Sequence, residues 1–70
     1  MTEAEYLDPQ RYPLTTQPGL TINQQRMLDA VNLDDLREMR EFGKPMTEEQ
    51  TQRAAELEEK IMRWRQRSQK

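Results

Sequence analysis

Cysteine and histidine are both absent from this 70-residue sequence, and glycine occurs only twice. Without cysteine or histidine the chain has no disulfide, no thiolate nucleophile, no imidazole base and no zinc site of the usual kind. Gly19 and Gly43 alone cannot build a glycine-rich phosphate-binding loop. A core this small can hardly enclose a pocket that separates the pKa values of two carboxylates. The sequence therefore predicts a protein that is not an enzyme, with no catalytic, metal or cofactor site.

Long apolar runs are missing as well. Apolar residues make up 33% of the chain and charged residues 34%, so the surface dominates over the core. No segment approaches the roughly 20 apolar residues that cross a bilayer, and Met1 to Glu5 carries acids without the apolar run of a signal peptide. We therefore expect one small cytoplasmic domain, without membrane attachment, that is marginally stable without a partner. The oligomeric state stays open, with a monomer among the alternatives.

Residues 1–20 predict an extended tail. Pro9, Pro13 and Pro18 each oppose helix at their own position and at the preceding one. Pro18-Gly19 also indicates a turn before the first helical pattern. We expect this tail to be disordered or loosely attached in the free protein.

Four large apolar or aromatic side chains are distributed among these prolines: Tyr6, Leu7, Tyr12 and Leu14. An extended, proline-stiffened segment loses comparatively little entropy when it docks, so these residues resemble the anchors of short linear binding motifs. The tail is thus a candidate protein-binding site. The alternative is that it forms a strap over the protein's own core.

The helical domain is expected at 21–70. A capping box formed by Thr21 and Gln24 predicts a first helix at about 21–31. The apolar face of this helix consists of Met27, Leu28 and Val31. Asn32, followed by two aspartates, predicts a second cap and a separate helix at about 33–42. One continuous helix from 21 to 42 is the competing interpretation.

A break in helix follows at Gly43 and Pro45, and a third helix is predicted at about 48–67. Thr47 and Gln50 form its capping box. Its apolar seam consists of Ala54, Leu57, Ile61 and Trp64, and we expect Trp64 to be mostly buried against Leu57 and Ile61. Favourable i, i+4 ion pairs are expected at Glu49–Arg53, Glu56–Lys60 and Glu59–Arg63.

These elements predict an all-α fold: a small three-helix unit, made of a helical hairpin and one packed helix, with an extended N-terminal tail. So small a unit cannot easily cover all of its methionine and aromatic side chains. The side chains that we expect to be incompletely covered are Met39, Phe42, Met46, Met62 and Trp64. Methionine and aromatic residues are favoured at adaptable interfaces, which again indicates protein binding.

The C-terminal end of the third helix is basic, although the net charge of the chain is −2. Arg63, Arg65 and Arg67 are therefore candidate contacts to a protein partner. Trp64 between arginines also permits a second hypothesis, a nucleic-acid-binding protein that stacks a base on the indole. Nearby acids oppose phosphate, so we expect weak or no nucleic-acid binding. A third hypothesis is a structural or assembly oligomer built on the third helix.

In general plan the chain resembles the very small cytoplasmic regulators encoded by bacteriophages, particularly the inhibitors that bind host RNA polymerase. The likeness consists of a docking-type tail from Tyr6 to Leu14, one compact helical unit from Thr21 to Arg67, and the absence of cysteine and histidine. It implies a non-enzymatic regulator of transcription that binds a larger protein assembly, with RNA polymerase as the suspected partner. The resemblance assigns no functional residues.

Overall fold

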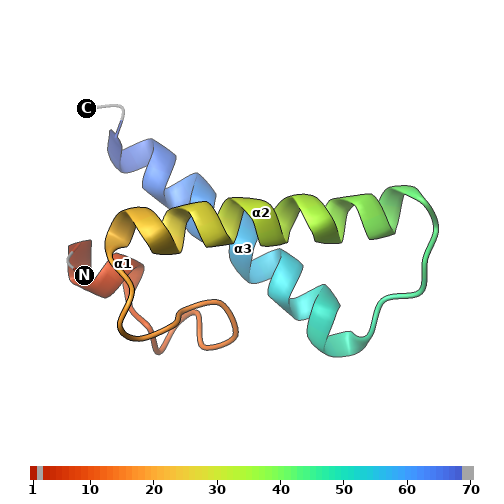
Figure 1. The fold of residues 1–70 in the computed structure, drawn as a ribbon, viewed down its shortest axis with the longest axis horizontal. Helices are drawn as coiled ribbons and strands as arrows, with labels where there is room; N and C mark the ends of the chain where they lie inside the picture. The colour runs from red at the N-terminus through yellow and green to blue at the C-terminus, as the bar shows by residue number, and fades with distance from the viewer. Residues whose placement is uncertain (2, 69–70) are drawn as a thin grey trace.

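The computed structural model describes residue 1 and residues 3–68, and within that range it contains helices and no strand (Figure 1). The helices are α1 (Glu3–Leu7), α2 (Ile22–Glu41) and α3 (Glu48–Ser68). The predicted all-α class is confirmed. No helix in the described part of the chain is both long and apolar enough to cross a lipid bilayer.

α2 is one continuous helix, so the division predicted at Asn32 is wrong and the competing interpretation holds. The reason lies in the inner face of α2, which we define by its four buried residues. These are Gln25, Asp29, Leu33 and Leu36. Their helical spacing continues on both sides of Asn32, so packing against the rest of the protein favours an unbroken helix over a second cap.

The ends of α2 follow the expected rules. The Thr21 amide donates to Gln24 Oε1 over 3.0 Å, and the Gln24 amide donates to Thr21 Oγ1 over 3.2 Å, which completes the capping box. At the other end Gly43 has a φ of 70°, a left-handed conformation in which glycine escapes the cost of a Cβ. The chain then turns and returns as α3.

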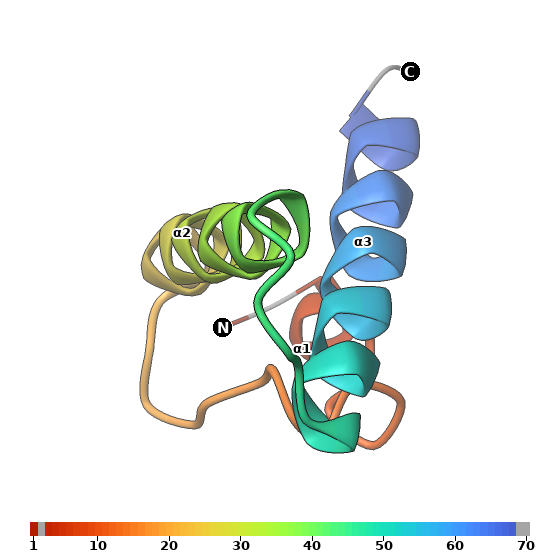
Figure 2. The same ribbon diagram turned by 90° about the vertical axis from the view of Figure 1, so that its right-hand side faces the viewer.

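α2 and α3 cross as a hairpin, as two views at right angles make clear (Figures 1 and 2). Near the turn their contact is apolar. The buried residues of this first cluster are Leu33, Leu36, Ala54 and Leu57, and the half-buried residues around them are Met39, Met46 and Ile61. The capping box of Thr47 and Gln50 is formed as predicted.

Residues 3–20, which we call the strap, pack against the helices beside α3 (Figure 2). Tyr6, Leu7 and Tyr12 are buried in a second cluster, with Ile22 and Trp64 packed against them. The expectation of an extended, loosely attached tail is therefore corrected: three of its large side chains are buried, in contact with Ile22 of α2 and Trp64 of α3. The strap alternative describes the structure better.

The strap is irregular in backbone as well as in sequence. Residues 3–8 have φ values between 51° and 74°, so α1 is a short left-handed turn. This conformation costs residues other than glycine about 1–2 kcal/mol each. The burial of Tyr6 and Leu7 must offset that cost, so the turn depends on its tertiary contacts rather than on local propensity.

Candidate functional site

The structure places the predicted docking residues of the tail mainly in the interior. Tyr6 and Tyr12 are each 1% exposed, Leu7 is buried and Leu14 is half-buried. Their contacts are with the protein's own side chains, among them Trp64. In this conformation a partner cannot reach the aromatic rings, so an interface built on them would first require the strap to leave.

The basic tip of α3 is partly neutralised within the chain. Arg63 Nε lies 3.2 Å from Glu59 Oε1, and Arg67 Nη2 lies 3.2 Å from Oε2 of Glu3 in the strap. Arg65 is exposed. The structure therefore separates the predicted contacts into two sets, a buried set in the strap and a surface set on α3.

Trp64 occupies a different place from the one predicted. It is half-buried and packs in the second cluster with Tyr6, whose ring centroid lies 5.5 Å from the indole in an edge-to-face arrangement. The guanidinium of Arg26 lies 4.6 Å from the centre of the same indole. Tyr6 and Arg26 therefore already contact the ring that the nucleic-acid hypothesis needs for base stacking.

A buried ion pair joins α2 to α3. Lys60 Nζ lies 3.1 Å from Asp29 Oδ2, and both side chains are fully buried. Lys60 was expected to pair with Glu56 on the surface of α3; instead it turns inward. The ring of Tyr6 covers it, with Nζ 4.2 Å from the ring centroid, and Nζ also donates to Thr16 Oγ1 over 3.3 Å. The strap thus closes the site over the lysine.

Gln25 connects this ion pair to the strap backbone. Its Nε2 donates to Asp29 Oδ1 over 2.7 Å and to the carbonyl oxygen of Thr15 over 2.8 Å, while its Oε1 accepts from the Gln17 amide over 2.9 Å. Both polar atoms of the buried Gln25 amide group, Nε2 and Oε1, therefore have hydrogen-bond partners. This network fixes the position of the strap in a way that the apolar contacts alone would not.

Burial dominates the electrostatics of the pair. It raises the pKa of Asp29, although the hydrogen bond from Gln25 and the charge of Lys60 act to lower it. It lowers the pKa of Lys60, which Asp29 in turn acts to raise. Burial and the nearby charge of Asp29 both raise the pKa of Tyr6. Each group thus loses hydration that its partners replace only in part.

This network serves structure in the conformation observed. Lys60 is enclosed by Asp29, Tyr6 and Thr16, so its amine faces protein groups rather than an open substrate site. Among the described residues, no group of three or more acidic side chains is arranged to hold a metal ion. The ion pair therefore accounts for how the strap is held.

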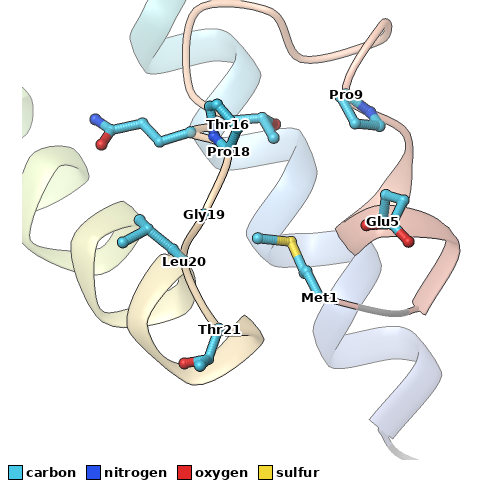
Figure 3. A pocket seen from close by; sticks show the side chains of 9 residues that line it. Met1, Glu5, Pro9, Thr16, Pro18, Gly19, Leu20 and Thr21 are labelled. Carbon is cyan, nitrogen blue, oxygen red and sulfur yellow. The ribbon is translucent and has the colours of Figure 1, made fainter.

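A pocket of about 600 Å³ opens between the two halves of the strap (Figure 3). Met1, Glu5 and Pro9 lie on one side of it, and Thr16, Pro18 and Leu20 lie on the other. Among the described residues that line the pocket, Glu5 alone has a charged side chain. The pocket is mostly aliphatic, and nothing in its lining selects a particular ligand.

The most exposed apolar side chains on α2 lie on the side opposite the core. We define the outer face of α2 as the stripe Met27, Val31, Asp34, Glu38 and Glu41. Met27 is 70% exposed and Val31 is 57% exposed, and the three acidic residues are exposed as well. Phe42, which is 72% exposed, extends the stripe at its C-terminal edge.

The acids of the outer face form no ion pair in the described part of the chain. Within residues 3–68 no lysine or arginine forms an ion pair with Asp34, Glu38 or Glu41. Two arginines nearby in the sequence pair with Glu58 of α3 instead. Arg37 Nε lies 3.9 Å from Glu58 Oε1, and Arg40 Nη1 lies 3.8 Å from the same oxygen. The outer face is therefore apolar in its N-terminal half. Its C-terminal half is acidic, and these acids form no ion pair with the described residues.

The sequence interpretation missed this surface because it assigned Met27 and Val31 to an apolar core face. The structure puts Gln25 and Asp29 on the core side instead and leaves the two apolar residues in solvent. A signal for the surface was present: Met27 and Val31 belong to the same stripe as Asp34 and Glu38 once one helix is assumed. The expected exposure of some methionine and aromatic residues is confirmed for Phe42 and Met62.

Comparisons with known proteins leave the site to be interpreted on its geometry alone. No family model matches the chain, and searches of curated proteins and of solved structures found no match either.

Proposed function

We propose that this protein is a small non-enzymatic regulator that docks on a larger protein assembly through the outer face of α2. The observation that carries the proposal is the exposure of Met27 and Val31 on a helix, next to acids that form no ion pair with any lysine or arginine in residues 3–68. Apolar side chains exposed together on a rigid element, bordered by charge, are typical of protein-binding surfaces.

The chemistry of the outer face favours a protein over other macromolecules. Asp34, Glu38 and Glu41 would repel nucleic-acid phosphates and anionic lipid headgroups. A protein surface can supply both an apolar contact for Met27 and Val31 and cations for the acids. The buried position of Tyr6 and Tyr12 further moves the proposed interface from the tail to α2.

RNA polymerase is the partner that we propose within this class, with the protein acting in the cytoplasm as a modulator of transcription. The general resemblance to small bacteriophage regulators supports that choice. Charge supports it too, because enzymes that hold nucleic acid expose the basic surfaces that an acidic helix face would meet.

The test measures the affinity of the fluorescently labelled protein for purified bacterial RNA polymerase. We expect Met27→Gln/Val31→Gln to weaken binding by about tenfold or more, because truncating or polarising central interface residues costs more than about 1 kcal/mol. Ala55→Gln/Met62→Gln, a matched double change at exposed positions of α3, should bind like the wild type.

Circular dichroism of each variant provides the control for folding. Equal weakening by both double variants would contradict the proposed surface. Failure of the wild-type protein to bind the polymerase at micromolar concentration would contradict the proposed partner.

A further inference from the structure

The outer face of α2 has the spacing of a helix-pairing seam. Its five residues follow one another at intervals of four, three, four and three positions. An apolar or charged pattern with this mean period of 3.5 residues is what one helix presents to another along a shared seam. The inner face of the same helix already packs against α3 and the strap, so α2 has a second seam that nothing in the described part of the chain covers.

We infer that this second seam binds a single helix of the partner, whose facing residues are apolar at one end and lysine or arginine at the other. The inference rests on the proposed function and names the element that the outer face recognises. The order of the chemistry along α2 specifies the order on the partner: Met27 and Val31 require apolar side chains, and Asp34, Glu38 and Glu41 require cations.

A second copy of α2 does not satisfy this seam in either direction. In a parallel pair the acids would face acids. In an antiparallel pair Met27 and Val31 would face Glu41 and Glu38, and Asp34 would face Asp34. Both arrangements leave charges without counter-ions, so self-association through this face is disfavoured.

The seam also has a length suited to one helix. From Met27 to Glu41 it covers 14 residue steps, or about 21 Å at 1.5 Å per residue, which is the length of about two heptads. The inner face of α2 is packed over most of this span, through Leu33 and Leu36 with Met39 half-buried beyond them, and this packing favours a rigid helix. A preformed, rigid helix loses little conformational entropy when a partner helix docks.

Synthetic helical peptides of about 21 residues test the inference without knowledge of the partner. One peptide carries two leucines followed by three lysines at the facing heptad positions, a second carries the reverse order for antiparallel docking, and a control pair replaces each lysine with glutamate. Isothermal titration calorimetry should show one lysine peptide binding at least about tenfold more tightly than its glutamate control.

A charge exchange then locates the interaction. Asp34→Lys/Glu38→Lys should weaken the lysine peptide and strengthen the matching glutamate peptide, each by about tenfold. Glu5→Lys/Glu48→Lys makes the same change in net charge at exposed positions away from the seam, and it should shift both affinities by less than about threefold at physiological salt. Circular dichroism again reports whether each variant is folded.

The outcomes separate the inference from the proposed function. No difference between the lysine and glutamate peptides, or equal effects of the two charge variants, would overturn the helix-pairing inference. If the polymerase still bound in a manner sensitive to Met27 and Val31, the proposed function would stand without it. The inference would be supported directly if Asp34→Lys/Glu38→Lys reversed the preference from the lysine peptide to the glutamate peptide and Glu5→Lys/Glu48→Lys did not.

Discussion

The two faces of α2 use the same residue types in opposite ways. On the inner face the polar residues Gln25 and Asp29 are fully buried, and Gln25 forms hydrogen bonds with the strap backbone at Thr15 and Gln17. On the outer face the apolar residues Met27 and Val31 are in solvent. A simple rule that places apolar residues inside and polar residues outside therefore fails along this half of the helix.

The contrast indicates that the inner face of α2 contributes to stability and that its outer face is available for binding. The burial of Asp29 is tolerated because Lys60 forms an ion pair with its carboxylate and Gln25 donates a hydrogen bond to it, while Tyr6 of the strap covers Lys60. An exposed methionine has no such structural explanation. We therefore expect substitutions on the inner face to change the free energy of unfolding, and those on the outer face to change only binding.

The largest effect is expected from Lys60→Met. It leaves Asp29 buried without its counter-ion, which should lower the free energy of unfolding by about 3–5 kcal/mol at neutral pH. In a domain of this size that loss can unfold the protein, so chemical denaturation should be followed in the presence of a stabilising osmolyte. Asp29→Leu/Lys60→Met removes both charges and should recover most of the loss.

The same variant should show a characteristic pH dependence. Burial raises the folded-state pKa of Asp29 above its unfolded value, so this group favours folding below the unfolded pKa, and that contribution is lost as the pH rises through the folded pKa. Without the charge of Lys60 the folded pKa rises further. The destabilisation of Lys60→Met, measured against the wild type, should therefore be smaller near pH 4.5 than near pH 7. An equal loss at both pH values would contradict the buried carboxylate.

Tyr6→Ala should lower the free energy of unfolding by about 3 kcal/mol, because it leaves a cavity between Lys60 and Trp64. Tyr6→Phe keeps the ring over the ammonium and should cost about 1 kcal/mol or less. Urea denaturation followed by tryptophan fluorescence measures both. A neutral Tyr6→Ala would mean that the strap is detached in solution, as the sequence had suggested.

Thr47→Ala tests the start of α3 and should cost about 1 kcal/mol. It removes the hydroxyl that accepts from the Gln50 amide over 3.1 Å. Thr47→Ser preserves that acceptor and serves as the control, with an expected change below about 0.5 kcal/mol in thermal or urea denaturation. Equal losses in the two variants would indicate that the threonine methyl group, and not the cap, supplies the stability.

The smallest effect on stability is expected from Met27→Gln, on the outer face. Glutamine has a helix propensity similar to that of methionine, and the side chain is already in solvent, so the change should stay within about 0.5 kcal/mol. Met62→Gln, at a position that is 60% exposed on α3, provides a matched comparison. A loss above about 2 kcal/mol at Met27 alone would show that the outer face belongs to the fold.

Local signals in the sequence were sufficient for the parts of the fold that depend on neighbours in the chain. The capping boxes at Thr21 and Thr47 and the break at Gly43 predicted helix ends to within about one residue. The helix break predicted at Asn32 was wrong, because asparagine is also tolerated inside a helix whose packing continues on both sides.

The candidate site required tertiary information. The pairing of Asp29 with Lys60 joins residues 31 positions apart, and the local alternative, Glu56 with Lys60, fits the i, i+4 rule equally well in sequence. Which face of α2 is buried follows from that pairing and from the strap. The periodicity of the helix alone could not decide it, so Met27 and Val31 were assigned to the wrong side.

The central claim, that α2 binds through its outer face while the strap stays closed, can be tested by one NMR titration. Isotopically labelled protein is titrated with the lysine peptide that binds more tightly, and chemical-shift changes are mapped along the chain. We expect the largest changes at Met27, Val31 and Glu38, with the signals of Tyr6 and Tyr12 unchanged. Large changes at the two tyrosines, with α2 unaffected, would place the interface under the strap and contradict the account.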